Sequence, residues 1–399
     1  MVNMTLVQHP VGQGGMMSGR LQATGAGRFH WVYDCGSNQR SALNREIDVV
    51  AMFGDIDCLF VSHLDSDHIS GIDRLLGRVR AREVVLPYLN EIDSLVALTH
   101  DITTGNVTAS FADFLSDTAG WLGQRGVERI TYVMPRSDDD GEGDGPNLPD
   151  NGERAEPDTV RPEWSPPPVD LPGGKTVAVA QRQINPGSYL KVLTGTGQLD
   201  WIFVPYAHRP SPRALLTFMD EFRTTFNGAP ANAAFLSFVL CDASARSALR
   251  ACYDLIWSDH NLVSMALYAG PVRQTGSWEG LIAHRHCDFE VLDTSGGWLC
   301  TGDMHLNVRR RQKAFLAHYR QLLDAVRVFC LPHHGSHLNF DLSLLEYLPN
   351  AHHILAATGP NSYGHPSKVV RRGVVTSNRE FVKVTHKPSS TLKWRQRAT

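Results

Sequence analysis

The chain has 399 residues, of which 42% are hydrophobic and 20% are charged, and this composition is typical of a folded globular protein rather than a disordered one. No run approaches the roughly 18 consecutive apolar residues that cross a bilayer, and the N-terminus lacks the basic and apolar regions of a signal peptide. Seven scattered cysteines without a C-x-x-C pair argue against a disulfide framework, so the expected compartment is the reducing cytoplasm.

The net charge of −3 conceals two charged segments of opposite sign. Nine acidic residues and one arginine lie between residues 138 and 158, within a stretch, 135–174, that is rich in Pro and Gly. Such a stretch cannot bury enough apolar surface to offset the entropy cost of ordering, which predicts a flexible acidic linker or insertion. Residues 368–399 carry nine Lys or Arg and one Glu, a balance that fits either a polyanionic partner or a solvated basic edge.

The linker at 135–174 divides the chain into two halves. Residues 1–134 form the N-terminal half, and residues 261–399 form the C-terminal half with its basic tail. Residues 175–260 are predicted to be an insertion or a segment of uncertain structure. The linker and this segment are candidate docking surfaces for a protein partner.

Short apolar runs predict the elements of the N-terminal half in order along the chain. Strands are expected at 29–33, 56–61 and 83–86, and apolar residues at helical spacing predict a helix at 69–76. The glycine cluster within residues 12–15 predicts a tight hairpin.

The C-terminal half alternates in the same way. Strands are expected at 262–268, 298–300, 328–331 and 354–357, and an apolar stripe predicts a helix at 309–326. Strands that alternate with helices predict an α/β architecture.

Polar residues follow four of the predicted strands at the point where each strand ends. These residues are Asp34, His63, Asp303 and His333. Functional side chains of layered α/β proteins gather at such ends, because a rigid sheet holds the loops that carry them. The glycine hairpin is expected to pack near the same edge.

The strongest local signal is the segment 62–71, which reads S-H-L-D-S-D-H-I-S-G. Four potential metal ligands, His63, Asp65, Asp67 and His68, occupy six positions. Residues i and i+2 at a strand end project to the same side, so His63 and Asp65 can bind one ion. Asp67 and His68, at the turn into the helix, can bind a second. A polar turn that caps a helix is the alternative, but capping requires neither two histidines nor a second aspartate.

This segment resembles the His-x-His-x-Asp-His signature of the metallo-β-lactamase superfamily, with Asp65 in place of the second histidine. With this substitution the segment resembles the variant motif of the metallo-β-lactamase domain in ComEC-type DNA-uptake channels. Further matches to that domain follow in the same order at 11–15 (VGQGG), 33–36 (YDCG), 261–264 (NLVS), 301–303 (TGD), 331–336 (LPHHGS) and 361–366 (NSYGHP). The resemblance implies a four-layered αββα sandwich with a dinuclear metal site at one edge, interrupted here by the acidic Pro/Gly-rich insertion.

The resemblance also implies which residues bind the metals. His63 and Asp65 bind the first ion, Asp67 and His68 bind the second, and Asp303 bridges the two. These assignments are carried over position by position from the matching motifs.

Three further histidines and one aspartate have expected roles at this site. His334 and His365 match family histidines that approach the metals. One of them should complete the second site, and the other should donate a proton to the leaving group or contact the substrate. His333 is a candidate general acid or supporting residue, and Asp34 is expected to orient a ligand from behind. The expected catalytic residues are Asp67, His333, His334 and His365.

A third histidine of the first site is not evident in the sequence. His208, or the pair His284 and His286, are candidates, although each fits an ordinary polar loop or edge position better.

An aspartate in place of a histidine adds a hard oxygen ligand, which shifts the preference from zinc toward manganese or magnesium without excluding zinc. An aspartate-rich site also suits a phosphodiester better than a β-lactam. The expected function is a metal-dependent phosphodiesterase, foremost a nuclease that hydrolyses DNA with a hydroxide activated by two divalent ions. The alternatives are a hydrolase of a small ester, phosphodiester or lactone, and a metal-containing binding or regulatory subunit of a larger complex.

The basic tail is the predicted nucleic-acid contact, with Phe381 or Trp394 stacking on bases. The residues expected to follow the phosphate backbone are Arg371, Arg372, Arg379, Lys383, Lys387, Lys393, Arg395 and Arg397.

Overall fold

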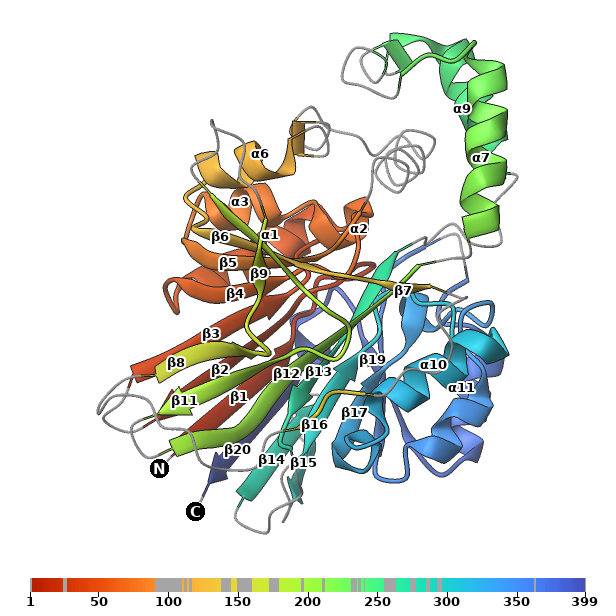
Figure 1. Ribbon diagram of the computed structural model, residues 1–399. Helices are drawn as coiled ribbons and strands as arrows, with labels where there is room; N and C mark the ends of the chain where they lie inside the picture. The colour runs from red at the N-terminus through yellow and green to blue at the C-terminus, as the bar shows by residue number, and fades with distance from the viewer. Residues whose placement is uncertain are drawn as a thin grey trace.

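The computed structural model has two β-sheets packed face to face, with helices on both outer surfaces (Figure 1). No helix in the part of the chain that it describes is long and apolar enough to cross a membrane. The described residues are 2–23, 27–89, 110, 113–114, 117–137, 145–148, 160–171, 179–194, 197–209, 212–230, 235, 238–239, 241–254, 263–272, 278–284, 288–292, 296–361 and 364–398.

The first sheet is 11-stranded, in the order β15-β14-β20-β1-β2-β3-β4-β5-β6-β10-β9. Its strands β3 to β6 run parallel, so their carboxyl ends meet at one edge, where β1 also ends. The strands are β1 (Val2–Gln8), β2 (Met17–Ala23), β3 (Gly27–Tyr33), β4 (Ile56–Phe60), β5 (Ala81–Pro87), β6 (Arg129–Val133), β9 (Val169–Asp170), β10 (Ala180–Ile184), β14 (Trp278–His284), β15 (Asp288–Leu292) and β20 (Leu392–Ala398).

The second sheet is 9-stranded, in the order β19-β18-β17-β16-β13-β12-β11-β8, with β7 paired to β12. Its parallel strands β16 to β19 end at the same edge as β4, because β13 meets the end of β4 there: Met265 N donates to Ser62 O over 2.7 Å. The strands are β7 (Arg136–Ser137), β8 (Val160–Ser165), β11 (Tyr189–Thr194), β12 (Gly197–Arg209), β13 (Ser264–Gly270), β16 (Gly297–Cys300), β17 (Val326–Cys330), β18 (His353–Ala357) and β19 (Glu380–Val384).

The helices lie on both sides of the paired sheets, and α7 and α9 form a hairpin that extends from the body at the upper right of Figure 1. The α-helices are α1 (Arg40–Ala51), α2 (Ser66–Ile69), α3 (Ile72–Leu76), α6 (Thr118–Gln124), α7 (Pro212–Thr225), α9 (Ala243–Asp254), α10 (Arg309–Tyr319) and α11 (Lys368–Thr376). The 3-10 helices are η2 (Leu323–Ala325), η3 (Pro332–Gly335), η4 (Leu342–Tyr347) and η5 (Pro388–Ser390).

Three hydrophobic cores hold these layers together. The central core lies between the sheets and contains the fully buried rings of Trp31, Trp201, Trp298 and Trp394. A second core joins the first sheet to α1, α3 and α6, and a third joins the second sheet to α10, η4 and α11. The order of layers is therefore helix, sheet, sheet, helix, and the predicted four-layered α/β sandwich is confirmed.

Two predicted helices differ from the structure. The helix expected at 69–76 is divided into α2 and α3 at Gly71, where a Cβ atom would lie 2.8 Å from the Sγ atom of Cys35. The chain makes a close approach to the end of β3 there, which a continuous helix with a side chain does not allow. The helix expected at 309–326 ends at Tyr319, and the chain from Val326 belongs to β17, where the neighbouring Val328 and Phe329 face opposite cores.

The segments expected to lie outside the sandwich contribute strands to it. Within the predicted flexible linker, residues 160–171 form β8 and β9, and the buried Trp164 in β8 belongs to the central core. Within 175–260, strands β10 to β12 extend both sheets, whereas α7 and α9 protrude. The acidic residues between 138 and 158 lie outside the described residues.

The basic tail is also part of the fold, as α11, β19 and β20. Strand β20 pairs with both β1 and β14, and Trp394 is fully buried in the central core. The prediction that Trp394 stacks on bases is wrong, because its ring has no surface to offer. Phe381 packs against the third core and is half-buried.

A hydrogen-bond network around the buried Glu83 links the two sheets at the side of the sandwich away from β20. Glu83 in β5 is 2% exposed, and its Oε1 atom accepts hydrogen bonds of 2.8 Å each from Trp164 Nε1 and Arg182. Thr131 also donates to this oxygen, over 2.5 Å.

Replacing Glu83 with alanine should lower the free energy of unfolding by about 3 kcal/mol, because it leaves Arg182 without its carboxylate and Trp164 without its acceptor. Urea denaturation followed by circular dichroism measures the change. The matched control is Glu128→Ala, because the Glu128 side chain is 59% exposed beside Arg129 and its loss should cost less than about 1 kcal/mol. Equal losses in the two variants would contradict a structural role for the Glu83 network.

Candidate metal centre

Seven polar side chains converge at the edge where the parallel strands end. They follow β3, β4, β16, β17 and β18, and they are Asp34, His63, Asp65, Asp303, His333, His334 and His365. Three of them have left-handed backbones, with φ values of 58° at Asp34, 47° at His333 and 56° at His334. Such conformations cost roughly 1–3 kcal/mol each in non-glycine residues, so the surrounding packing must hold them. In return His333 and His334 both face the site, which adjacent residues of a regular strand cannot do.

The first group of potential ligands surrounds one oxygen of Asp303. His63 Nε2 lies 3.6 Å from Asp303 Oδ2 and 3.6 Å from Asp65 Oδ2. His333 Nε2 lies 3.6 Å from the same Asp303 oxygen. Ligand atoms of His63, His68 and Asp303 lie within 4.8 Å of one another, and Asp65 and His333 lie beside this group, each 3.6 Å from one of its members.

The second group lies on the other side of Asp303. His334 Nε2 is 3.1 Å from Asp67 Oδ2, and His68 Nε2 is 3.5 Å from Asp303 Oδ1. Ligand atoms of Asp67, His68 and His334 all lie within 4.8 Å of one another. The Asp303 carboxylate therefore directs one oxygen toward each group.

These separations fit metal coordination. Ligand atoms bound about 2.0–2.2 Å from a tetrahedral ion lie about 3.3–3.6 Å from one another. The Nε2 atoms of His63 and His68 are buried and make no hydrogen bond with a described residue, a cost that a bound cation removes. The residues thus fit divalent metal binding, with His63, His68 and Asp303 as one group of ligands and Asp67, His68 and His334 as the adjacent one.

Asp34 lies behind the ligands and fixes their rings. Its Oδ2 atom is 2.8 Å from His68 Nδ1, and it accepts a 2.7 Å hydrogen bond from the Ser62 hydroxyl. The same hydroxyl lies 2.8 Å from His63 Nδ1. Because the Nδ1 atoms are engaged in this way, the Nε2 atoms of both histidines face the site.

Backbone and amide oxygens hold the remaining two ligands in the same manner. His334 Nδ1 lies 2.8 Å from Ala357 O, and His333 Nδ1 lies 3.1 Å from Asn339 Oδ1. The roles of Ser62 and Asn339 could not be predicted from the sequence, because a lone Ser or Asn near a histidine has no distinguishing pattern.

The glycine hairpin lies directly against this arrangement. Gly15 N donates to Asp67 O over 3.0 Å, and a Cβ atom at Gly15 would lie 2.8 Å from His68 Nδ1 and 3.0 Å from Asp34 Oδ2. A side chain here would separate Asp34 from His68, so the close approach requires glycine.

The electrostatics of the centre favour positive charge. Burial alone would lower the pKa of His68, but the carboxylates of Asp34, Asp67 and Asp303 raise it to about 10. Burial would raise the pKa of Asp67, but His68 and His334 hold it well below its usual range, and neighbouring histidines do the same for the pKa of Asp303. Protonated histidines balance part of the negative charge of these carboxylates, and bound divalent ions would balance the rest.

His365 lies beside the two ligand groups rather than within them. Its ring is 4.9 Å from that of His333, and burial together with the nearby His333 and His334 lowers its pKa to about 4. Of the two histidines that the sequence left open, His334 is the one that lies with Asp67 and His68.

The candidates for a third histidine of the first site lie elsewhere. His208 Nδ1 is 3.2 Å from the Tyr206 hydroxyl, and His284 Nδ1 is 3.6 Å from Glu380 Oε1. Neither belongs to a ligand group found among the described residues, and His286 lies outside them. His333 lies closer to the first group, with its Nε2 atom 3.6 Å from Asp303 Oδ2.

The basic residues of the tail lie at three places: on α11, on β20, and on or just after β19. Arg371 and Arg372 are exposed on α11, which begins three residues after His365. On β20, Lys393 and Arg395 alternate with buried residues and so face away from the central core, and Arg395 pairs with Thr5, about 10 Å from the metal edge. Lys383 in β19 and Lys387 before η5 are exposed near that edge.

No protein-family model and no curated protein matches the chain. Among solved structures, it is similar to a long-form RNase Z from yeast, with 10% identity over 91% of this chain and a TM-score of 0.31. The match covers 37% of the yeast protein's length. A metallo-β-lactamase from Cronobacter sakazakii, mutated in its HARLDQ motif, is 16% identical over 62% of this chain and 90% of its own, with a TM-score of 0.21. These scores are low, and the assignment of the centre rests on its own geometry.

Replacing Asp34 with asparagine should weaken metal binding about 10- to 100-fold, because Asp34 orients His68 and, through Ser62, His63. Competition with a chromophoric chelator measures the affinity for zinc and manganese. Asp48→Asn is the matched control, since Asp48 is exposed on α1 and pairs only with surface arginines among the described residues. An Asp34→Asn protein that is folded and binds metal as tightly as the control would contradict the role given to Asp34.

Proposed function

We propose that the chain is a metal-dependent hydrolase of the metallo-β-lactamase superfamily, and more narrowly a phosphodiesterase that cleaves nucleic acid, DNA in the first place. The observation that carries the proposal is the Asp303 carboxylate between two adjacent groups of ligand atoms at one edge of an αββα sandwich. The ordered motifs of the sequence, which resemble the ComEC-type domain, supply most of these ligands.

Two divalent ions, when bound, activate water and stabilise negative charge on the attacked and leaving oxygens of a phosphodiester. The residues of the chain set the geometry in which this occurs. Asp303 fixes the spacing of the two ligand groups, and Asp34 fixes the histidine rings. His365, at the rim beside His333, is placed to contact the substrate rather than to complete a ligand group.

The nature of the ligands and of the rim supports a phosphate-containing polymer as substrate. Three aspartates, Asp65, Asp67 and Asp303, supply hard oxygen atoms, which favour ions that also engage phosphate oxygens. Exposed cations surround the edge, and they make no hydrogen bond or ion pair through their side chains with a described residue. They are Arg309 at the start of α10 and Lys368, Arg371 and Arg372 on α11. Unpaired cations around a catalytic edge attract a polyanion.

A cleavage assay on single- and double-stranded DNA and RNA tests the function. The wild-type protein is run with manganese, magnesium or zinc beside an Asp67→Ala/His68→Ala protein. Metal-dependent cleavage should fall to background in the double variant, because it removes two of the ligands around the second position. A protein that binds metal but cleaves no polymer would overturn the nuclease proposal, and hydrolysis of a small phosphodiester, ester or lactone would then favour the small-molecule alternative.

Removing the positive charge of α11 should weaken DNA binding without changing the chemistry. For duplex DNA, a plot of the logarithm of the binding constant against the logarithm of salt concentration should be shallower by about 1.8 in an Arg371→Gln/Arg372→Gln protein. Each phosphate contact contributes about 0.9 to this slope. Turnover of bis(p-nitrophenyl) phosphate should stay at the wild-type rate. An unchanged salt dependence would remove α11 from the DNA contact.

A further inference from the structure

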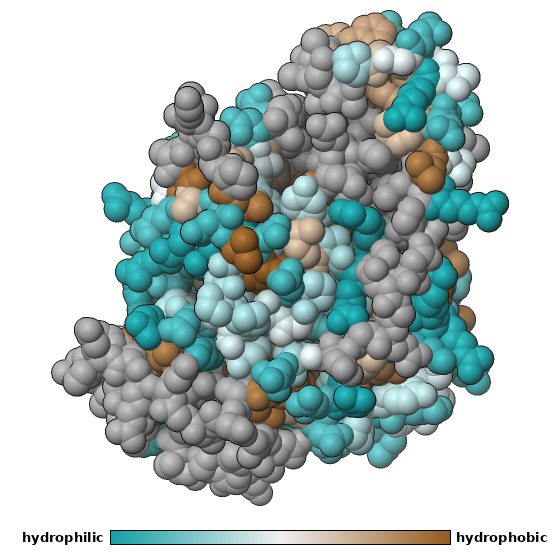
Figure 2. Space-filling view, viewed as in Figure 1, coloured by the Kyte–Doolittle hydropathy of each residue, from teal (hydrophilic) through white to brown (hydrophobic). Residues whose placement is uncertain are grey.

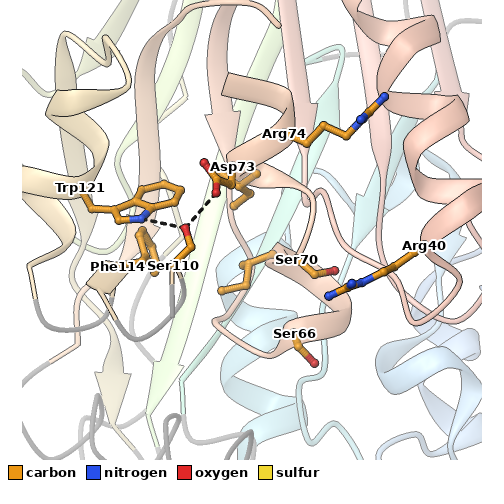
Figure 3. Close-up of a pocket in the computed structure, with 10 residues that line it drawn as sticks. Arg40, Ser66, Ser70, Asp73, Arg74, Ser110, Phe114 and Trp121 are labelled. Atoms are coloured by element: carbon orange, nitrogen blue, oxygen red, sulfur yellow. Dashed lines mark hydrogen bonds between the residues drawn. The ribbon is translucent and has the colours of Figure 1, made fainter. Parts of the chain in front are cut away.

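A cavity of about 540 Å³ lies next to the metal centre, among α1, α2, α3 and α6 (Figure 3). Its volume is within the range of about 300–1,000 Å³ that is typical of ligand sites. Figure 2 shows hydrophobic side chains at the surface over α2 and α3, with hydrophilic side chains around them. The metal centre does not use this cavity.

One wall of the cavity is apolar and aromatic. Ile69, Ile72, Phe114 and Trp121 line it and are buried. The Phe114 and Trp121 rings lie edge to face, with their centroids 5.1 Å apart. This wall suits a flat, largely apolar group better than a sugar or a free ion.

The polar groups on the same wall are already paired. Trp121 Nε1 donates to Ser110 Oγ over 3.2 Å, and that hydroxyl donates to Asp73 Oδ2 over 2.9 Å, as the dashed lines in Figure 3 show. Arg125 Nε donates to Asp73 Oδ1 over 2.8 Å. Burial alone would raise the pKa of Asp73, but the hydrogen bonds from Arg125 and Ser110 lower it. The carboxylate is therefore charged and neutralised within the protein, and it does not repel an anionic ligand strongly.

Among the described residues that line the cavity, one cation on the opposite side is available. Arg40 is exposed, projects toward Ser70 in Figure 3, and makes no side-chain hydrogen bond or ion pair with a described residue. It is the first residue of the 12-residue helix α1, whose amino end adds partial positive charge. Arg74, which also lines the cavity, is held by both oxygens of Asp48 at 3.1 Å.

The cavity and the metal centre lie on either side of the start of α2. Ser66 lines the cavity, and it lies between Asp65 and Asp67, one in each ligand group. Consecutive Cα atoms are 3.8 Å apart. A group that contacts Ser66 in the cavity is thus within one residue of the carboxylates on both sides.

We propose that this cavity binds an unpaired nucleobase of a single-stranded nucleic acid, with Arg40 on an adjoining phosphate, so that a neighbouring phosphodiester reaches the metal centre. The apolar wall contacts the base, and Arg40 binds the phosphate. Ser66 lies on the side of the cavity toward the metal centre, where the phosphodiester bond to be cleaved would lie. The proposal deepens the function proposed above and rests on it: a strand held by one extruded base is cleaved beside that base. A fully paired duplex cannot fill the cavity without unstacking.

Equilibrium binding to the full-length, metal-loaded protein tests the base contact. The probe is a fluorescent single strand of about 12 nucleotides with phosphorothioate linkages, which resist cleavage, compared with an abasic strand of equal charge. The intact strand should bind about 5- to 150-fold more tightly, the equivalent of 1–3 kcal/mol for one base. Ser70→Phe, which projects a ring into the cavity from an exposed position, should abolish that difference. Ser70→Ala keeps the space and should retain it.

The phosphate contact is tested separately. Arg40→Gln should weaken the intact and the abasic strands equally and reduce the salt dependence of binding by about 0.7, the contribution of one phosphate on a single strand. Arg78→Gln is the matched control, because Arg78 is exposed on the same side of the molecule, pairs with Asp48 and does not line the cavity.

Two results would overturn the proposal: equal affinity for the intact and abasic strands, or an unchanged preference in a folded Ser70→Phe protein. Both are measured without turnover, so they are separate from the failure of the nuclease proposal, which is the absence of cleavage. A protein that cleaves nothing can still prefer the intact strand, with Ser70→Phe removing that preference. This result would support base binding in the cavity and contradict only the proposed nuclease activity.

Discussion

The burial of several carboxylates at one point is the constraint on which the rest of the structure depends. Asp34, Asp65 and Asp303 are all at most 9% exposed, and Asp67 is half-buried beside them. Isolated carboxylates in such surroundings are costly, and they are stable only with cations close by. Histidines supply part of that charge, and the spacing of their Nε2 atoms leaves positions that divalent ions fit. The histidines therefore stabilise the carboxylates in part, and the donor set suits a bound divalent cation.

The backbone around the centre carries strain that the sandwich has to hold. Left-handed residues at Asp34, His333 and His334 follow β3 and β17, and Gly15 and Gly71 permit close approaches to Asp34 and Cys35 at the end of β3. The central core, with its four fully buried tryptophans, fixes the two sheets relative to each other. Each large buried side chain contributes about 1.5–3 kcal/mol, so the core can offset the strain at the site. The rigid sheets in turn keep ligands from the two halves of the chain within a few ångströms.

Much of this could be predicted from the sequence, for identifiable reasons. The strand ends at Asp34, His63 and Asp303 follow apolar runs with clear boundaries, and the segment 62–71 holds four ligands in six positions. The role of His333 could not be predicted, because it depends on two successive left-handed residues that turn both histidines of the pair toward the site. The strands β8 and β10 could not be predicted, because β8 pairs with β11 and β10 with β6 far along the chain, whereas composition suggested a linker. Trp394 was misjudged for the same reason, since only pairing with β1 and β14 buries it.

The proposed phosphodiesterase activity rests on the metal centre, the basic rim and the neighbouring cavity together. Its most direct test is the anomalous diffraction from crystals of the full chain grown with manganese. The account predicts two peaks about 3.5–4 Å apart. One should lie among His63, Asp65, Asp303 and His333, and the other among Asp67, His68, His334 and Asp303. A single peak, or no peak at this edge in a folded protein, would contradict a dinuclear centre and with it the proposed chemistry.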